Sequence, residues 1–262
     1  MRGLPLVVLM VASLAGAPLA DAASACHAAS GAHSRPLVEL YTSEGCDSCP
    51  PAEQWLSSQF DAAGEHSEAI ALAFHVDYWD RLGWADRFAK AEYTARQYDA
   101  MRANGASFVY TPQVLLQGRD SGTRRNAITA AIDAASRTPA RASIALDVVP
   151  GEHDLAVDVD ARVADAAPLR DAQLFVAYAD SGLVSDVKAG ENRGVRLTHD
   201  HVVRTLRVAG TPNRDGRLRA TLRIPRPDER GVHPMLVAFL ERGSNGEVLQ
   251  ALALPLDACA SM

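Results

Sequence analysis

Two cysteines separated by two residues, Cys46 and Cys49, are the residues of this chain best suited to chemistry. A pair at this spacing can form a local disulfide, exchange it with a thiol, or hold a soft metal ion. A zinc site made of cysteines alone needs four of them, and the sequence contains no second pair at this spacing. The pattern therefore favours redox chemistry, with an inert structural disulfide as the alternative.

The residues around the pair predict a strand, a turn and a helix. Residues 37–41 are apolar apart from one glutamate, and Pro50 and Pro51 suit the first turn of a helix that begins after Cys49. The unpaired N–H groups at a helix N-terminus stabilise a thiolate. We therefore expect Cys46 to be the exposed nucleophile and Cys49 to attack the mixed disulfide from inside.

The remainder of residues 36–139 predicts an α/β unit. The apolar run 69–76 is typical of a strand buried on both faces, and a further strand is expected at 113–117. Apolar residues at helical spacing predict helices over 88–103 and 123–136. Strands and helices that alternate in this way predict a sheet covered by helices.

After residue 139 the pattern changes to short alternating segments separated by Gly, Pro and Asp. These segments are 142–149, 155–161, 172–179, 201–208, 217–224, 235–240 and 248–254. Their spacing is typical of antiparallel strands in a β-sandwich. We therefore predict a β-sandwich domain over residues 140–258, following the α/β domain.

The N-terminus has the pattern of a cleaved export signal. Arg2 precedes an apolar stretch at 4–15, and Ala-Asp-Ala at 20–22 resembles a cleavage site. The apolar stretch is too short to span a membrane. We expect residues 1–22 to be removed, residues 23–35 to form a flexible arm, and the mature protein to be periplasmic or secreted, with no membrane span.

The composition narrows the choice of partners. Hydrophobic residues make up 48% of the chain and charged residues 22%, as in globular proteins. The net charge of −6 argues against a nucleic-acid partner, which would need a basic face. The chain also lacks a nucleotide-binding glycine motif, so no organic cofactor is expected, and the expected partners are protein thiols or disulfides.

Two further cysteines, Cys26 and Cys259, lie near opposite ends of the mature chain. An oxidising compartment would allow them to form a disulfide. Such a bond would tie the N-terminal arm to the C-terminal domain and, by chain entropy, would contribute about 5 kcal/mol. The alternative is that one or both are free.

Five segments resemble the secreted bacterial thioredoxin-like family of unknown function, domain of unknown function 1223. They are VELYTSEGCDSCPPA (38–52), AFHVDYW (73–79), YTPQ (110–113), GEN (190–192) and LTHDHVVR (197–204). The resemblance covers nearly all of the mature chain. It implies a thioredoxin-like domain followed by a β-rich domain, and it implies no substrate.

A thioredoxin-like fold suggests where a substrate would bind. In such folds a cis-proline begins the strand after the second helix and faces the cysteine pair, and the residue before it offers backbone groups to a bound peptide. We expect Thr111 and Pro112 to have these roles, with an ordinary trans turn as the alternative. The aromatic residues Tyr78, Trp79 and Trp84 would wall a peptide groove or pack in the core.

Glu39 resembles the buried acid beneath the thioredoxin disulfide. Residues 37, 39 and 41 point to one face of the predicted strand. The resemblance implies that Glu39 would shuttle the proton of Cys49. A solvated carboxylate on an edge strand is the alternative.

Histidines offer a competing interpretation. His75 ends the central strand, and with Cys46 and Cys49 it would complete a copper or zinc site. His199 and His201 are expected to share one strand face, where a second metal site is conceivable. The sequence thus predicts an exported thiol–disulfide oxidoreductase that acts on protein or small thiol substrates. The alternatives are a copper- or zinc-binding protein and a non-catalytic partner-binding protein.

Overall fold

A computed structural model describes five stretches of the chain, namely residues 26–60, 68–122, 125–164, 169 and 171–259. The predicted export signal lies outside these residues, as does the start of the predicted arm. Among the described residues, no helix combines the length and the apolar character needed to cross a membrane.

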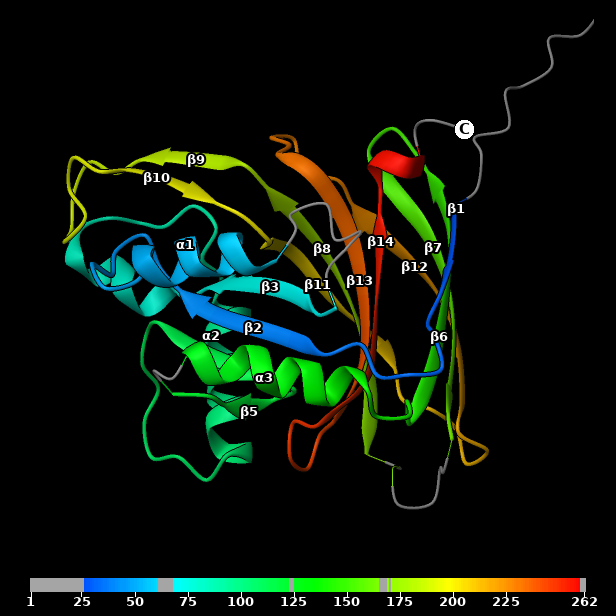
Figure 1. Cartoon of the computed structure of the whole chain (residues 1–262). Coiled ribbons are helices and arrows are strands. Elements are labelled where there is room, and N and C mark those ends of the chain that lie inside the picture. The colour runs from blue at the N-terminus through cyan, green and yellow to red at the C-terminus, as the bar shows by residue number, and fades with distance from the viewer. Residues whose placement is uncertain (1–25, 61–67, 123–124, 165–168, 170, 260–262) are drawn as a thin grey trace, which may run out of the picture.

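The central element is a mixed sheet of eight strands in the order β14-β13-β8-β11-β3-β2-β4-β5 (Figure 1). Its strands are β2 (Leu37–Thr42), β3 (Ile70–His75), β4 (Gln113–Leu116), β5 (Arg119–Asp120), β8 (Ala172–Ser181), β11 (Val202–Gly210), β13 (Val232–Arg242) and β14 (Val248–Pro255). All residues of β3 are buried, which confirms the interpretation of the apolar run as a strand covered on both faces. Strands β2 and β3 are parallel and in register, with Thr42 opposite His75, so both end at the same edge of the sheet.

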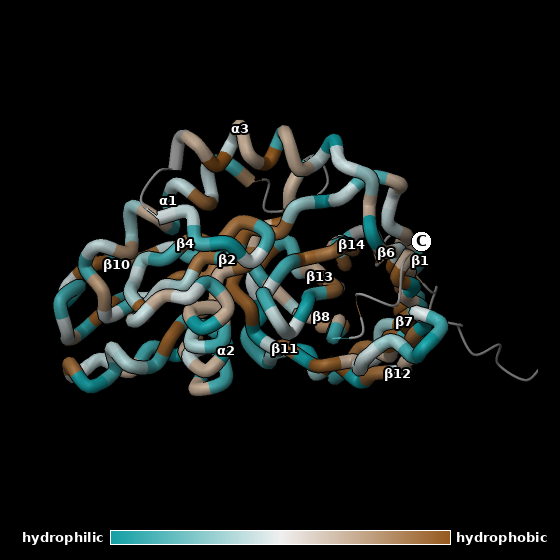
Figure 2. The backbone as a smooth tube through the Cα atoms, turned by 90° about the horizontal axis from the view of Figure 1, so that it is seen from below, coloured by the Kyte–Doolittle hydropathy of each residue, from teal (hydrophilic) through white to brown (hydrophobic). Residues whose placement is uncertain are grey.

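Three α-helices cover this part of the sheet: α1 (Pro50–Gln59), α2 (Ala91–Ala103) and α3 (Arg125–Ser136). Helices α1 and α3 pack on one face, where Leu56 and Ile128 join the same apolar cluster. Helix α2 packs on the other face through Tyr93. Figure 2 shows α1 and α3 above the strands and α2 below them. The short 3-10 helix η1 (Asp77–Leu82) follows β3.

A separate antiparallel sheet has the order β1-β6-β7-β12. Its strands are β1 (Cys26–Ala29), β6 (Ala142–Pro150), β7 (Asp154–Val163) and β12 (Arg217–Pro225). In β6 the buried residues Ile144, Leu146 and Val148 alternate with more exposed ones, as the sequence pattern predicted. The buried face packs against β8, β13 and β14 of the central sheet in one apolar core.

The sequence predicted an α/β domain and a β-sandwich domain that meet near residue 140. The structure instead carries the central sheet across that boundary, because β11 pairs in parallel with β3 through Val202 and Ala73. The two halves of the chain therefore share one sheet. The second sheet covers only one part of the central sheet, the part formed by β8, β11, β13 and β14.

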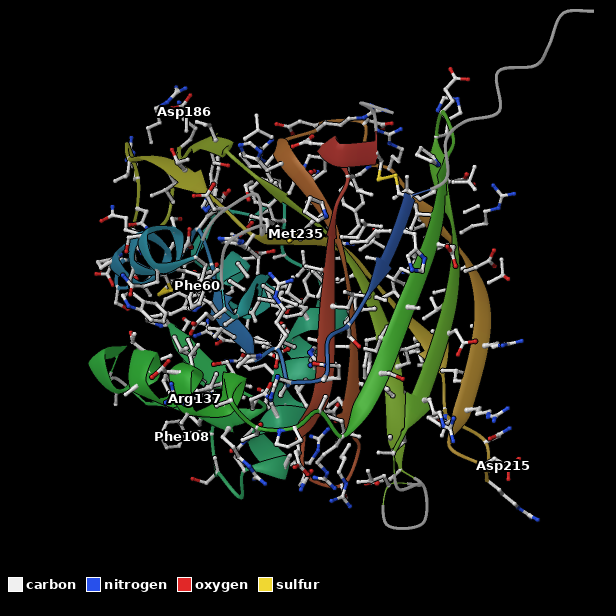
Figure 3. All side chains as sticks on the ribbon, turned by 45° about the vertical axis from the view of Figure 1, so that its right-hand side comes forward. Phe60, Phe108, Arg137, Asp186, Asp215 and Met235 are labelled. Carbon is white, nitrogen blue, oxygen red and sulfur yellow. A yellow bond between two sulfur atoms is a disulfide. The ribbon has the colours of Figure 1, made fainter. Side chains whose placement is uncertain are left out.

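The flexible arm predicted for residues 23–35 is wrong for its described part, because Cys26–Ala29 form β1 and pair with β6. The structure also joins Cys26 to Cys259 in a disulfide with a Cα–Cα distance of 5.5 Å. Cys259 lies in the 3-10 helix η2 (Asp257–Cys259). Figure 3 shows this disulfide beside η2 and a second disulfide beside α1.

A two-stranded hairpin of β9 (Leu183–Asp186) and β10 (Arg196–His199) stands apart from both sheets. Figure 1 shows it alongside α1, and β10 contacts that helix. The hairpin matters for the site because the loop between its strands lies against the cysteine pair.

Candidate thiol–disulfide site

The second disulfide joins Cys46 and Cys49, with a Cα–Cα distance of 5.4 Å. It follows β2 and begins α1, so the predicted strand, turn and helix around the pair are confirmed. Cys49 is the N-cap residue of α1, and its carbonyl oxygen accepts hydrogen bonds from the backbone N–H groups of Ala52 and Glu53. Pro50 and Pro51 occupy the first turn of α1. N–H groups in a first turn have no acceptor within the helix, so the N–H that proline lacks costs no helical hydrogen bond.

Both cysteines of this pair are fully buried, with 0% exposure. The prediction that Cys46 is an exposed nucleophile is therefore wrong for this conformation. The disulfide is nevertheless shallow, because the two residues between the cysteines, Asp47 and Ser48, are exposed. The hydroxyl of Ser48 lies 3.4 Å from Sγ of Cys46.

The turn between β9 and β10 contacts the backbone around the pair. We call residues 190–194 of this turn the cover loop. The side-chain amide of Asn192 donates hydrogen bonds to the carbonyl oxygens of Glu44 and Cys46, both at 2.9 Å. The carboxylate of Glu191 accepts a hydrogen bond from the backbone N–H of Asp47 at 3.2 Å. Since Asn192 is only 6% exposed, these bonds are shielded from water. The cover loop is therefore fastened to the backbone of the cysteine pair.

The predicted substrate-binding residues form a half-buried group next to the turn that precedes Cys46. They are Tyr78, Trp79, Thr111 and Pro112. The Thr111–Pro112 peptide bond is cis, as predicted. The indole N–H of Trp79 donates a hydrogen bond to Oγ1 of Thr111 at 2.8 Å. A Cβ atom on Gly45 would lie 3.0 Å from Cβ of Trp79, so glycine allows the turn before Cys46 to approach the aromatic residue closely. Tyr78 lies beside Trp79, with 6.4 Å between the ring centroids.

Glu39 has a different environment from the one predicted. It is 2% exposed, which excludes a solvated edge-strand carboxylate. Its partner is Arg96 of α2, at 2.7 Å, and Arg96 also pairs with Glu241 of β13. Burial raises the pKa of Glu39, and the charge of Arg96 opposes that rise. The proton-shuttle role of Glu39 stays a prediction that these contacts do not support.

Two buried acids flank the cysteine pair in the sequence, Glu44 in the preceding turn and Glu53 of α1. Both contact His199, the last residue of β10. Nδ1 of His199 lies 2.6 Å from Oε2 of Glu53, and Nε2 lies 3.4 Å from Oε1 of Glu44. The other oxygen of Glu44 accepts a hydrogen bond from Trp84 at 2.5 Å, and Thr42 donates one to Glu53 at 2.5 Å.

A second histidine–carboxylate pair adjoins this group. Nδ1 of His75, at the end of β3, lies 2.7 Å from Oδ2 of Asp86, and both side chains are fully buried. The rings of His75 and His199 meet edge to face, with their centroids 5.1 Å apart. We call these five residues (Glu44, Glu53, His75, Asp86 and His199) the buried cluster.

The contacts of the buried cluster shift its proton equilibria. Burial lowers the pKa of His199, but the hydrogen bonds and charges of Glu44 and Glu53 outweigh it and raise that pKa to about 10. Burial raises the pKa of Glu44, yet its hydrogen bonds, chiefly from His199, leave it below the usual value. Burial likewise raises the pKa of Asp86, and the neighbouring His75 more than offsets this effect. The two neighbouring carboxylates therefore favour the protonated form of His199.

The copper or zinc site of Cys46, Cys49 and His75 stays a prediction, and the structure groups the histidines differently. One ligand atom each from His75, Glu53 and His199 lies within 4.8 Å of the others, whereas Cys46 and Cys49 are bonded to each other. The prediction that His199 and His201 share a strand face is wrong. Strand β10 ends at His199, and His201 lies in the turn before β11 with a positive φ of 58°.

One protein-family model matches most of the chain. The family described as "Protein of unknown function (DUF1223)" matches residues 37–241. The chain belongs to the DUF1223 family. No curated protein matches it. This DUF1223 protein resembles the crystal structure of an Agrobacterium tumefaciens protein, with 27% identity, a TM-score of 0.60, and coverage of 86% of this chain and 96% of that one.

The DUF1223 protein also resembles HBP35 of Porphyromonas gingivalis, with a TM-score of 0.59. That likeness covers 87% of this chain and 76% of HBP35 at 15% identity, and it shows the fold alone.

Sequence reasoning missed the roles of Asn192, Glu44, Glu53 and Asp86 in this DUF1223 protein. The segment GEN at 190–192 was noticed only as a family signature, and the structure makes it part of the cover loop. Glu44 and Glu53 gave no periodic signal, because their partner His199 lies in a distant part of the chain.

Proposed function

We propose that this protein is an exported thiol–disulfide oxidoreductase with a thioredoxin-like site, in which Cys46 and Cys49 exchange their disulfide with protein or small-molecule thiols. The observation that carries the proposal is the position of this disulfide at the N-terminus of α1. The partial positive charge at a helix N-terminus favours a thiolate, the form in which a cysteine attacks or leaves. The half-buried cis peptide of Thr111 and Pro112, joined to the turn through Trp79, would receive the substrate backbone.

The proposed reaction balances as a two-electron exchange. In the oxidised protein a substrate thiolate attacks Sγ of Cys46 and releases Cys49 as a thiolate. A second substrate thiol then attacks the mixed disulfide, so that the substrate leaves oxidised and the protein holds two reduced cysteines. The reverse sequence reduces a substrate disulfide. Because both cysteines are buried, either direction requires neighbouring residues to move first, and we propose that the cover loop, which is bonded to the Cys46 carbonyl, is the segment that moves.

The test compares the two disulfides of one protein. Reduction of insulin and oxidation of a dithiol peptide should both be measured for wild type, Cys46→Ser and Cys49→Ser. We expect turnover in at least one direction, lost in both variants. The matched control is the Cys26→Ser/Cys259→Ser double variant, which removes the other disulfide and should retain turnover once its fold is verified by circular dichroism. Absence of turnover in the wild type in both directions would reject the proposal.

Export is tested separately. A chain with residues 1–22 should reach the periplasmic fraction or the medium of an expressing bacterium, and a chain without them should stay in the cytoplasm. Retention of the full-length chain in the cytoplasm would contradict export without affecting the redox proposal.

A second candidate is a partner-binding protein with a silent disulfide. The full burial of Cys46 and Cys49 favours it, since an inert structural disulfide needs no exposed sulfur. The turnover measurement above separates the two candidates.

A further inference from the structure

We propose that Glu53, His75 and His199 bind one divalent transition-metal ion, with zinc as the natural occupant. These residues come from α1, β3 and β10, elements that meet beneath the cover loop. One ligand atom from each lies within 4.8 Å of the other two. An ion between them would need only small side-chain shifts to reach zinc–ligand distances of about 2.0–2.2 Å.

The buried nitrogen atoms of the cluster are incompletely paired. Among the residues that the structure describes, Nε2 of His75 has no hydrogen-bond partner, although the side chain is fully buried. Nε2 of His199 has only the longer contact of 3.4 Å with Glu44. An unpaired polar atom in the interior costs free energy unless something binds it. A metal ion is one such partner, because a neutral imidazole nitrogen is a common zinc ligand.

Each proposed imidazole ligand already has a carboxylate behind or beside it. Asp86 holds Nδ1 of His75 at 2.7 Å and leaves Nε2 of that ring facing away from it. Such a carboxylate fixes the ring orientation and tautomer of a metal-binding histidine and makes the ligand more basic. Glu44 lies 3.4 Å from Nε2 of His199 and provides a second carboxylate next to the proposed ion.

The charges of the buried cluster favour a cation. Glu44, Glu53 and Asp86 can carry three negative charges, and the two histidines offset at most two of them. Within the described part of the chain, the ion pairs of these carboxylates are with histidine alone. A buried excess of negative charge is costly, and a divalent ion would relieve it.

The donor set indicates the class of metal. Two imidazoles and one carboxylate are typical of zinc sites that leave a fourth position for water or substrate. Calcium and magnesium prefer oxygen ligands, and copper(I) prefers sulfur, which this group does not offer. The site is distinct from one built on the cysteines, because Cys46 and Cys49 are bonded to each other.

The test is metal binding by the full mature protein with both disulfides oxidised. After treatment with a chelator, zinc is titrated by calorimetry, and cobalt(II) is used as a spectroscopic probe. We expect one ion per chain, and cobalt bands typical of nitrogen and oxygen ligands without a thiolate charge-transfer band. Zinc should also raise the melting temperature of the wild-type protein, because it binds the folded state.

Variants identify the ligands. His75→Gln and His199→Gln should each weaken zinc binding more than Asp86→Asn, for which a loss of about 10–100-fold is expected. The matched control is His27→Gln. His27 pairs with Asp147 at 2.8 Å, but on the surface, so this substitution removes a similar pair and should leave binding unchanged.

Two results would overturn the proposal: a wild-type protein that binds no zinc, or binding that survives both His75→Gln and His199→Gln. The Cys46→Ser/Cys49→Ser variant should bind zinc like the wild type. The metal site and the redox function can therefore fail independently, and a protein that binds zinc only after reduction of its disulfide would support a cysteine site instead.

Discussion

Replacing Asn192 with alanine tests whether the cover loop controls access to the disulfide. The substitution removes two hydrogen bonds of 2.9 Å, those from the Asn192 amide to the carbonyl oxygens of Glu44 and Cys46. A neutral hydrogen bond contributes about 0.5–1.5 kcal/mol, so the closed state should lose about 1–3 kcal/mol. The population in which the loop is displaced should then rise by about 5–150-fold.

The assay is the rate at which a dilute thiol reductant opens the Cys46–Cys49 disulfide. Samples are quenched with an alkylating agent, and the peptide that contains both cysteines is quantified by mass spectrometry, which separates it from the Cys26–Cys259 disulfide. If reduction proceeds through the open population, the rate in Asn192→Ala should rise by the same factor.

Asn104→Ala is the matched control. The side-chain amide of Asn104 also donates to two backbone carbonyl oxygens, those of Ala100 at 2.8 Å and Gly118 at 2.9 Å, at the end of α2. Its loss should destabilise the protein by a similar amount without exposing the disulfide. Equal reduction rates in wild type and Asn192→Ala, or the same acceleration in both variants, would refute a gating role for the cover loop.

Three further perturbations follow from the packing. The pKa of His199 is raised from 6.5 to about 10, so in chelator-treated protein its contribution to stability is complete below pH 6.5 and is lost as pH rises toward about 10. The difference in unfolding free energy between wild type and His199→Gln, measured in urea, should shrink across that range, and a constant difference would contradict the assignment. Arg96→Met leaves the buried Glu39 without its cation and should cost about 3–5 kcal/mol in the same assay; a loss below about 1 kcal/mol would show that the pair is not desolvated. Gly45→Ala places a Cβ atom 3.0 Å from Cβ of Trp79 and should lower stability by about 1–3 kcal/mol, whereas an unchanged melting temperature would mean that the turn relaxes freely.

Local patterns predicted many of the elements correctly. The apolar run that became β3 and the alternation that became β6 each reflect how a strand buries one or both of its faces, and that depends on neighbouring residues only. The same holds for the start of α1, where Pro50 and Pro51 satisfy the requirements of a first helical turn.

The joining of the two halves could not be predicted in this way. The alternation of the later strands is equally compatible with a closed sandwich and with strands added to an existing sheet. The pairing of Val202 with Ala73 decides between these two arrangements. It is a contact between residues more than a hundred positions apart in the sequence.

The amino-acid sequence by itself determined the disulfide pair, its place between a strand and a helix, and the proline that precedes β4, because those features depend on residue type and short spacing. Only the tertiary structure decided that the pair is buried and that two histidines and three carboxylates form one buried cluster. Burial and ion pairing arise when distant segments pack together. A local sequence pattern does not show which distant residue will pack against a given position. Asn192 is the clearest example, since its side chain donates a hydrogen bond to the carbonyl of Cys46, 146 residues earlier in the chain.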